Sequence, residues 1–334
     1  MISSDQAKEQ EIVVEEINHL SKEVQAEMIA DSFASISQEY NELETKDIKF
    51  PPFNKEDIPY ISVKTVEKCL NGIQTNKATN KNDIPSIIFK KFSKFICEPT
   101  ANLINACIQQ GQWPDIFKCE VVTPVPKVFP PTQINDLRNI SGLLTLNKIA
   151  EKCIAELMIH DMKHKLDPTQ YANQKGISLQ HYLINMLNRI LTTLDNSSKG
   201  EAKAVIATFV DWKQAFPRQC PKLGIEAFIA NGIRPSLTPM LLSYFQKRNM
   251  TVKWKGVYSK IRKLNGRGPQ GGTFGILEYL SQSNDNADTM NEEDRFKFVD
   301  DLTVLEIINL ITMEISSSDL YAHVPSDIPP TIIT

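Results

Sequence analysis

Apolar side chains recur at spacings of three and four residues in several segments of the chain, which is typical of helices with one buried face. Residues 1–48 follow this pattern and predict one or two amphipathic helices. Prolines interrupt the pattern within residues 50–59 and indicate a linker into a new unit. Beyond this linker, the segments predicted to be helical are most of residues 63–110 (interrupted by a polar loop at 76–85), 147–163, 179–194 and 222–231.

Other segments have the patterns of β-strands. Residues 120–127 predict a short strand, and residues 250–257 alternate between apolar and polar side chains, which predicts a second one. Residues 204–210 form a continuous run of apolar and β-branched residues. Such a run predicts a buried strand, and this one ends directly before Asp211.

A β-hairpin is predicted near the C-terminal end of the sequence. Residues 296–298 and 302–305 have strand patterns and are separated only by Val299, Asp300 and Asp301. The hairpin therefore carries two carboxylates at its tip. Taken together, the predicted elements indicate an α+β fold that contains an antiparallel sheet.

Composition agrees with a soluble, intracellular globular protein, without distinguishing nucleus from cytoplasm. The chain has 334 residues, 41% of them hydrophobic, and contains neither a run of eighteen apolar residues nor an N-terminal signal segment. We therefore expect no membrane partner. The six cysteines form no CxxC pair and the five histidines have no metal-ligand spacing, which argues against a zinc site or a disulfide framework. Each cysteine is predicted to be reduced and mostly buried.

Charge is distributed unevenly along the chain, although the formal net charge is only -3. Residues 51–273 carry 31 of the 37 basic side chains and 16 of the 40 acidic ones. Both flanking segments are acidic. A positive middle segment suits a polyanionic partner such as nucleic acid, whereas the alternative is a set of solvated basic helix faces.

The acidic pair Asp300–Asp301 is not informative by itself. A chain of this composition contains about five adjacent acidic pairs by chance, and this one contains five, so a solvated turn explains the pair equally well. Its position is more informative, because Asp211 at a strand end and Asp300 and Asp301 at a hairpin tip can converge on one edge of a sheet. Two Mg²⁺ ions in a nucleotidyltransferase, roughly 3.5–4 Å apart, require such a cluster.

Two segments around these carboxylates resemble motifs of reverse transcriptases. Phe298-Val299-Asp300-Asp301 resembles the Phe/Tyr-x-Asp-Asp box, and residues 209–216 resemble the strand that carries the first catalytic aspartate in the enzymes of non-LTR, LINE-type retrotransposons. The resemblance implies that Asp211, Asp300 and Asp301 are catalytic and bind metal. Phe216, five residues after Asp211, then occupies the place of the aromatic steric gate that selects deoxynucleotides; without the resemblance it would be interpreted as a core aromatic.

Further segments resemble motifs of the same family and occur in the family's order. Residues 268–272 are similar to the Pro-Gln-Gly motif, so Gln270 and Gly271 are expected at the nucleotide. Lys127 and Arg138, which belong to a segment similar to the fingers motif, would hold the triphosphate. Residues 76–85 resemble the string that precedes the polymerase core, and residues 170–178 resemble a box expected to line the template path. Individually, such segments also fit ordinary turns and surface charges.

The resemblance covers roughly residues 63–310 and implies a right-hand polymerase with fingers and palm. The expected organisation is a helical N-terminal extension at 1–50, the reverse transcriptase fingers and palm at 51–310, and a poorly ordered tail at 311–334. The implied activity is RNA-directed DNA polymerisation, a nucleotidyl transfer that uses two Mg²⁺ ions, or Mn²⁺ in their place. RNA template, DNA primer and dNTP are the implied partners.

Some positions depart from the family's pattern. Pro217 stands where many relatives have a second aspartate, Asn139 replaces a proline of the fingers motif, and residues 80–82 replace a Gly-Pro pair. The few residues after Asp301 contain no segment expected to form a thumb, so the fold is expected to be C-terminally truncated. Two alternatives to an active polymerase follow from these departures and from the charge distribution. One is a catalytically inactive retroelement remnant that binds nucleic acid; the other is an interaction protein that uses its acidic N-terminal helices.

Overall fold

The computed structural model describes residues 12–75, 83–172, 176–195, 202–212, 214–266 and 268–312. They form two compact units. The first unit comprises Met1–Met162 and Phe216–Glu278, and the second comprises Lys163–Ala215 and Tyr279–Thr334. The fold is α+β, and its small sheets are mainly antiparallel, in agreement with the fold class predicted from the sequence.

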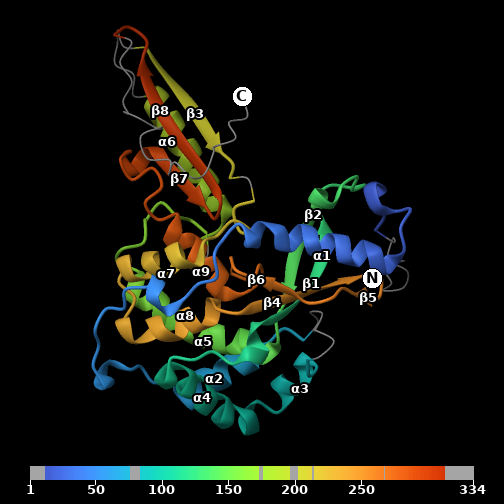
Figure 1. The fold of residues 1–334 in the computed structure, drawn as a ribbon. Helices are drawn as coiled ribbons and strands as arrows, with labels where there is room; N and C mark the ends of the chain where they lie inside the picture. The colour runs from blue at the N-terminus through green and yellow to red at the C-terminus, as the bar shows by residue number, and fades with distance from the viewer. Residues whose placement is uncertain are drawn as a thin grey trace, which may run out of the picture. The chain divides into compact units, whose positions relative to one another are not determined.

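Most helices belong to the first unit (Figure 1). They are α1 (Lys22–Gln38), α2 (Val63–Asn71), α3 (Ser86–Lys91), α4 (Ser93–Gln110), α5 (Thr145–Met162), α7 (Pro221–Ala230), α8 (Thr238–Phe245) and α9 (Thr273–Gln282), which continues into the second unit at Tyr279. The strands of the first unit are β1 (Cys119–Pro126), β2 (Leu137–Gly142), β4 (Arg248–Trp254), β5 (Val257–Tyr258) and β6 (Arg262–Leu264).

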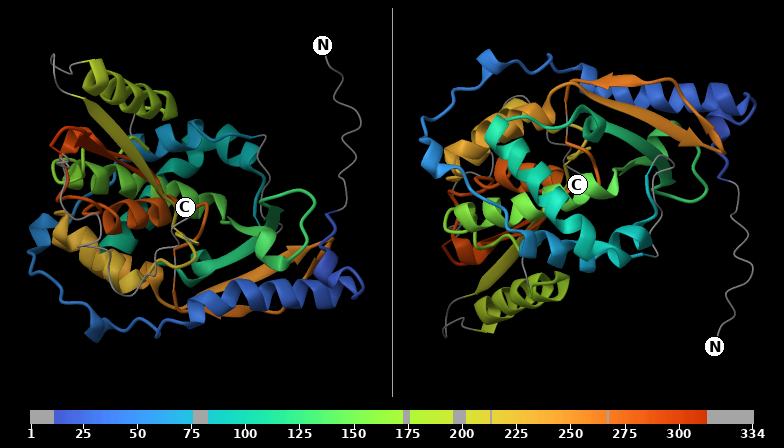
Figure 2. Two further views of the ribbon diagram at one scale, coloured as in Figure 1. Left: turned by 90° about the horizontal axis from the view of Figure 1, so that it is seen from above. Right: turned by 90° about the horizontal axis from the view of Figure 1, so that it is seen from below.

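The strands of the first unit form one sheet in the order β2-β1-β4-β5, with β6 also paired to β4. The pairing of β1 with β4 is parallel, and the other pairings in this sheet are antiparallel. Helix α1 lies along this sheet (Figure 1, Figure 2). Its buried face, which includes Ile29 and Phe33, packs against Val122, Val252 and Trp254. Helix α1 therefore contributes to the core of the first unit. The sequence predicted a domain boundary at residue 51, and neither unit begins or ends there.

Ion pairs also join α1 to the sheet. The guanidinium of Arg262 on β6 donates hydrogen bonds to Glu27 and Asp31 of α1, both at 2.6 Å. The Glu27 carboxylate also accepts from the backbone N–H of Lys260 at 2.9 Å. Part of the acidic charge of the N-terminal segment is thus paired with basic side chains of the same chain.

The second unit consists of helix α6 (Leu179–Asp195) and a three-stranded antiparallel sheet in the order β3-β8-β7. Its strands are β3 (Lys203–Val210), β7 (Arg295–Phe298) and β8 (Asp301–Asn309). Helix α6 covers one face of the sheet, where Tyr182 and Met186 pack against Phe296 and Leu305 (Figure 1). On the opposite face, Met290 packs against Leu302 and Val304,.

Several predictions of local structure are confirmed. The predicted strands at 120–127 and 204–210 are β1 and β3, the predicted hairpin is β7–β8, and the helices predicted at 147–163 and 179–194 are α5 and α6. All six cysteines are free, but Cys119 is exposed because it is the first residue of β1 on the open face of the sheet. Apart from residues 311 and 312, the predicted tail lies outside the described residues. No helix in the described part of the chain combines the length and the apolar character needed to cross a membrane.

Candidate active site

The hairpin of the second unit places two acidic residues at its tip. Phe298 pairs with Asp301, so only Val299 and Asp300 connect the two strands. Val299 has a φ of 58°, in the left-handed region. Two-residue hairpin turns require a positive φ at this position and usually have glycine there. For a β-branched residue this conformation costs on the order of 1–3 kcal/mol, so the surrounding structure must hold the turn in place.

Asp211 lies at the same end of the sheet as the hairpin tip. Val210, the last residue of β3, pairs with Leu302 of β8, so one further step of this antiparallel register would bring Asp211 opposite Asp301. Residues directly opposite each other in such a pair point to one face, with Cβ atoms about 4.5–5.5 Å apart. Asp211 and Asp301 are exposed and Asp300 is half-buried. The structure therefore gathers all three predicted carboxylates at one end of the β3-β8-β7 sheet.

Asp300 and Asp211 are near enough to Asp301 to act on its charge. The side chain of Asp301 is exposed at the surface but still partly desolvated, which raises its pKa, and the negative charges of Asp300 and Asp211 raise it further. Burial also raises the pKa of the Tyr279 hydroxyl, and the same three carboxylates add to this increase. Carboxylates that repel each other at one place on a sheet bring no stability by themselves, but they form a favourable environment for a cation.

Carboxylate oxygens are the ligands that Mg²⁺ and Mn²⁺ prefer, so the donor chemistry fits the metal expected from the sequence. Among the described residues, however, no group of three or more His, Cys, Asp or Glu side chains is arranged to hold a metal ion. Mg²⁺ in such sites is usually held by one or two carboxylates, together with water and substrate phosphates. The open arrangement of Asp211, Asp300 and Asp301 is compatible with this mode of binding.

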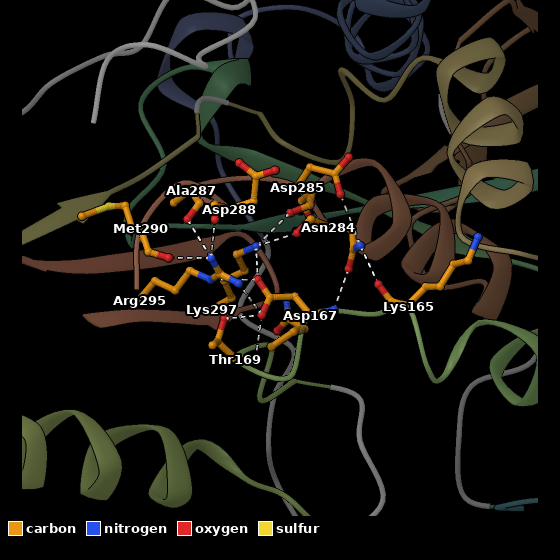
Figure 3. A network of polar contacts seen from close by, with 12 residues as sticks. Lys165, Asp167, Thr169, Asn284, Asp285, Ala287, Asp288, Met290, Arg295 and Lys297 are labelled. Atoms are coloured by element: carbon orange, nitrogen blue, oxygen red, sulfur yellow. Dashed lines mark hydrogen bonds and ion pairs between the residues drawn. The ribbon is translucent and has the colours of Figure 1, made fainter. Parts of the chain in front are cut away.

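A buried ion-pair network involves two basic residues of β7, the first strand of the hairpin (Figure 3). The ammonium of Lys297 and the guanidinium of Arg295, both on β7, contact the carboxylate of Asp167 at 2.6 Å and 3.2 Å. Lys297 also donates to the backbone carbonyl of Asn284 at 2.7 Å. Burial would raise the pKa of Asp167, but hydrogen bonds from Lys297 and Thr169 outweigh it, and the pKa is lowered.

Sequence reasoning did not identify this network. The signal that could have indicated it is the alternation of Arg295 and Lys297 with the aromatic residues Phe296 and Phe298 within one strand. In a strand covered on both faces, this alternation places two cations in the interior, where they need a buried anion. Asp167 is that anion, and it lies far away in the sequence.

In the first unit, the structure brings Lys127 and Arg138 onto neighbouring strands. Val125 of β1 pairs with Arg138 of β2, and Lys127 follows β1 directly. Lys127 is opposite Asp136, to whose carbonyl it donates its backbone N–H at 2.7 Å. Lys127 and Arg138 are therefore diagonal neighbours on one face of the β1–β2 pair, with Cα atoms about 7–8 Å apart, and both are exposed.

The loop that carries Gln270 and Gly271 lies beside β2. The carbonyl of Gln270 accepts the backbone N–H of Ser141 at 2.8 Å. Gly271 has a φ of 123°, and a Cβ atom at this residue would lie 3.1 Å from the Ser141 carbonyl oxygen. Glycine is therefore required at position 271 because the loop passes close to β2, the strand that carries Arg138.

The buried carboxylate of Glu151 fixes the C-terminal side of the same loop. It accepts the backbone N–H of Thr273 at 2.6 Å and that of Phe274 at 3.3 Å, and so caps the start of α9. It also accepts from the side chains of Asn147 and Tyr244. Burial raises the pKa of Glu151. This cap could not be predicted from the sequence, because Glu151 lies on α5, far from α9 along the chain.

The predicted site residues thus fall into two sets. Asp211, Asp300 and Asp301 are gathered in the second unit. The first unit contains Phe216, which is half-buried, together with the residues expected to bind nucleotide, which are Lys127, Arg138, Gln270 and Gly271. Parts of two motifs, residues 76–82 and 173–175, lie outside the described residues. Comparison with known proteins adds nothing to this assignment, since no family model and no curated protein matches the chain.

Proposed function

We propose that this chain is the fingers and palm region of an RNA-directed DNA polymerase, the reverse transcriptase of a non-LTR retrotransposon. The observation that carries the proposal is the position of Asp211 and Asp301 at the same end of the β3–β8 pair, with Asp300 at the adjacent hairpin tip. These are the residues that the family resemblance marks as catalytic. Two separate segments of the chain supply them, which a solvated acidic turn would not require.

The reaction proposed is attack of a primer 3′-hydroxyl on the α-phosphate of a dNTP, with pyrophosphate as the leaving group. Bound Mg²⁺ would supply activation of the attacking oxygen and neutralisation of charge on the leaving phosphate. Asp211 and Asp300 would hold the two ions, and Asp301 would support them. The grouping of these carboxylates at one end of the β3-β8-β7 sheet supports this assignment.

The first unit would bind the nucleotide and template. Lys127 and Arg138 lie on one exposed face of β1 and β2 and can contact a triphosphate, the guanidinium as a planar fork and the ammonium as a point charge. The loop with Gln270 and Gly271 is held beside β2 by the hydrogen bond from Ser141. Gln270 would position the template or nucleotide, and Phe216 would exclude the ribose 2′-hydroxyl.

Primer extension tests the proposal. The purified chain is incubated with a poly(rA)/oligo(dT) duplex, dTTP and either Mg²⁺ or Mn²⁺, beside the Asp300→Asn variant. The proposal predicts extension by the wild-type chain and its loss in the variant, with duplex binding unchanged. Binding of the duplex by both proteins without extension by either would favour the inactive nucleic-acid-binding remnant. Absence of both binding and extension would favour the interaction protein.

A further inference from the structure

The turn that carries Asp300 is attached to a segment outside the hairpin. Residues that follow α5 run beside β7, where Gln170 forms a parallel bridge with Lys297. The backbone N–H of Lys297 donates to the Thr169 carbonyl at 3.0 Å, and the N–H of Tyr171 donates to the Lys297 carbonyl at 2.8 Å. The ion pair between Asp167 and Lys297 fastens the same segment to β7 (Figure 3).

The side chain of Gln170 extends this attachment to the turn itself. Its Oε1 atom accepts the backbone N–H of Val299 at 3.0 Å, and its Nε2 atom lies 3.5 Å from the Val299 carbonyl oxygen. The same Oε1 atom accepts the N–H of Ala172 at 3.1 Å, which fixes the orientation of the amide. Gln170 is only 8% exposed, so solvent cannot substitute for these contacts.

Gln170 contacts the residue of the turn that has the unfavourable backbone conformation. Val299 holds a positive φ that β-branched residues rarely adopt, and it immediately precedes Asp300. Rotation of the Val299 backbone toward an ordinary conformation would change the direction in which Asp300 leaves the turn. It would also disturb the pairing of Phe298 with Asp301.

We infer that Gln170 is a positioning residue for the metal-binding carboxylates, acting through the backbone of Val299 to fix the direction of Asp300 and Asp301. The inference rests on the proposed function. It differs from the template-path role expected for the segment 170–178, because the Gln170 amide is buried against the turn. In this role Gln170 would act through the turn and would not itself be a ligand of the metal.

The deciding experiment compares the wild-type chain with Gln170→Leu, which keeps the approximate size of the side chain and removes both polar contacts. Amide hydrogen exchange at Val299 reports the turn directly, and Tb³⁺ luminescence reports cation binding by the carboxylates without any need for turnover. We expect faster exchange at Val299 and a rise of about 10–100-fold in the half-saturating Tb³⁺ concentration, as for other groups that orient metal ligands. Gln180→Leu, at an exposed position of α6, is the matched control and should change neither quantity.

A double-mutant cycle separates positioning from a general structural role. Glycine adopts the conformation of Val299 without steric cost, so the turn of Val299→Gly needs less support. Gln170→Leu should therefore weaken Tb³⁺ binding less in the Val299→Gly background than in the wild-type chain. An equal loss in both backgrounds, or unchanged exchange at Val299 in Gln170→Leu, would overturn the inference.

A second substitution of Gln170 keeps the inference testable if the Gln170→Leu variant does not fold. Gln170→Glu keeps the oxygen that accepts the N–H groups of Val299 and Ala172, so protection of the Val299 amide should persist; its loss in this variant would count against the inference. Primer extension is measured in parallel. If Gln170→Leu changes amide exchange and Tb³⁺ binding as predicted, but the wild-type chain extends no primer, the role of Gln170 is supported and the proposed polymerase activity is contradicted.

Discussion

Asp211 and Asp301 lie at the same end of the β3–β8 pair, each next to one of the paired residues Val210 and Leu302. Asp211 directly follows β3, the strand that comes after α6, and Asp301 is the first residue of β8 in the hairpin. Their convergence is a property of the register, since a slip by one residue would turn the two side chains to opposite faces. The register is fixed by the apolar residues of the sheet, such as Leu305 and Val304, which are buried on its two faces.

The assignment of Phe216 as a steric gate predicts a change in nucleotide selectivity. In Phe216→Ala the space occupied by the ring becomes available to a ribose 2′-hydroxyl. We expect the ratio of ribonucleotide to deoxynucleotide incorporation to rise about tenfold or more, measured as the two kcat/KM values in primer extension. Phe228→Ala, which truncates a buried aromatic of α7, should reduce both kcat/KM values without changing their ratio. An unchanged ratio in Phe216→Ala would contradict the gate assignment.

Removal of the Glu151 cap should destabilise the first unit. Glu151→Ala leaves the N–H groups of Thr273 and Phe274 and the Tyr244 hydroxyl without their acceptor in a buried environment. We expect the free energy of unfolding to fall by about 2–4 kcal/mol, measured by urea denaturation with circular dichroism. Glu156→Ala changes an exposed glutamate of the same helix, and it should alter stability by no more than about 0.5 kcal/mol. Equal effects of the two substitutions would contradict the capping role.

The ion pair between Asp161 and Arg234 predicts a pH dependence of stability. Arg234 donates to the Asp161 carboxylate through two guanidinium nitrogens, at 2.7 Å and 2.6 Å, and through its backbone N–H at 3.1 Å. Burial raises the pKa of Asp161, but the hydrogen bonds and charge of Arg234 outweigh it, so that the pKa lies below its ordinary value of 3.8. The stabilisation is therefore fully present above pH 3.8 and is lost as the pH falls through the lower pKa of the folded state.

Asp161→Asn tests this dependence. At pH 7 the variant should be less stable than the wild-type chain by about 1–2 kcal/mol. The difference should shrink as the pH of the denaturation measurement falls below 3.8, because the wild-type carboxyl becomes protonated as the pH passes through the lower pKa of the folded state. Asp195→Asn, at an exposed residue, serves as the control and should show no such convergence. A difference that stays constant with pH would contradict the ion-pair explanation.

Local elements of the fold could be predicted because their determinants are local. The run of apolar residues at 204–210 and the short interval between residues 298 and 302 specify a strand and a hairpin without reference to the rest of the chain. The chemistry of Asp211, Asp300 and Asp301 could be proposed because carboxylates at strand ends tend to gather at a sheet edge. Their pairing register was not available from the sequence, since it depends on contacts between distant segments.

The contacts that support the turn and the sheet could not be predicted from the sequence, because they too join segments that are far apart along the chain. Gln170 lies far from Val299 in the sequence, and a glutamine carries no pattern that marks it as the partner of a strained turn. The role of α1 was also missed, because an acidic amphipathic helix before a proline-rich linker resembles a separate extension. Its apolar face, with Ile29 and Phe33, is instead buried on the sheet of the first unit.

In the function proposed for this chain, Asp211, Asp300 and Asp301 together form the metal site of a polymerase. The most direct measurement is the rate of primer extension as a function of Mg²⁺ concentration for the wild-type chain, Asp211→Asn and the exposed control Asp195→Asn. We expect Mg²⁺-dependent extension by the wild-type chain and the control and none by Asp211→Asn, although the two segments that carry the site are far apart in the sequence. Extension by Asp211→Asn at the wild-type rate and the same Mg²⁺ dependence would contradict the claim.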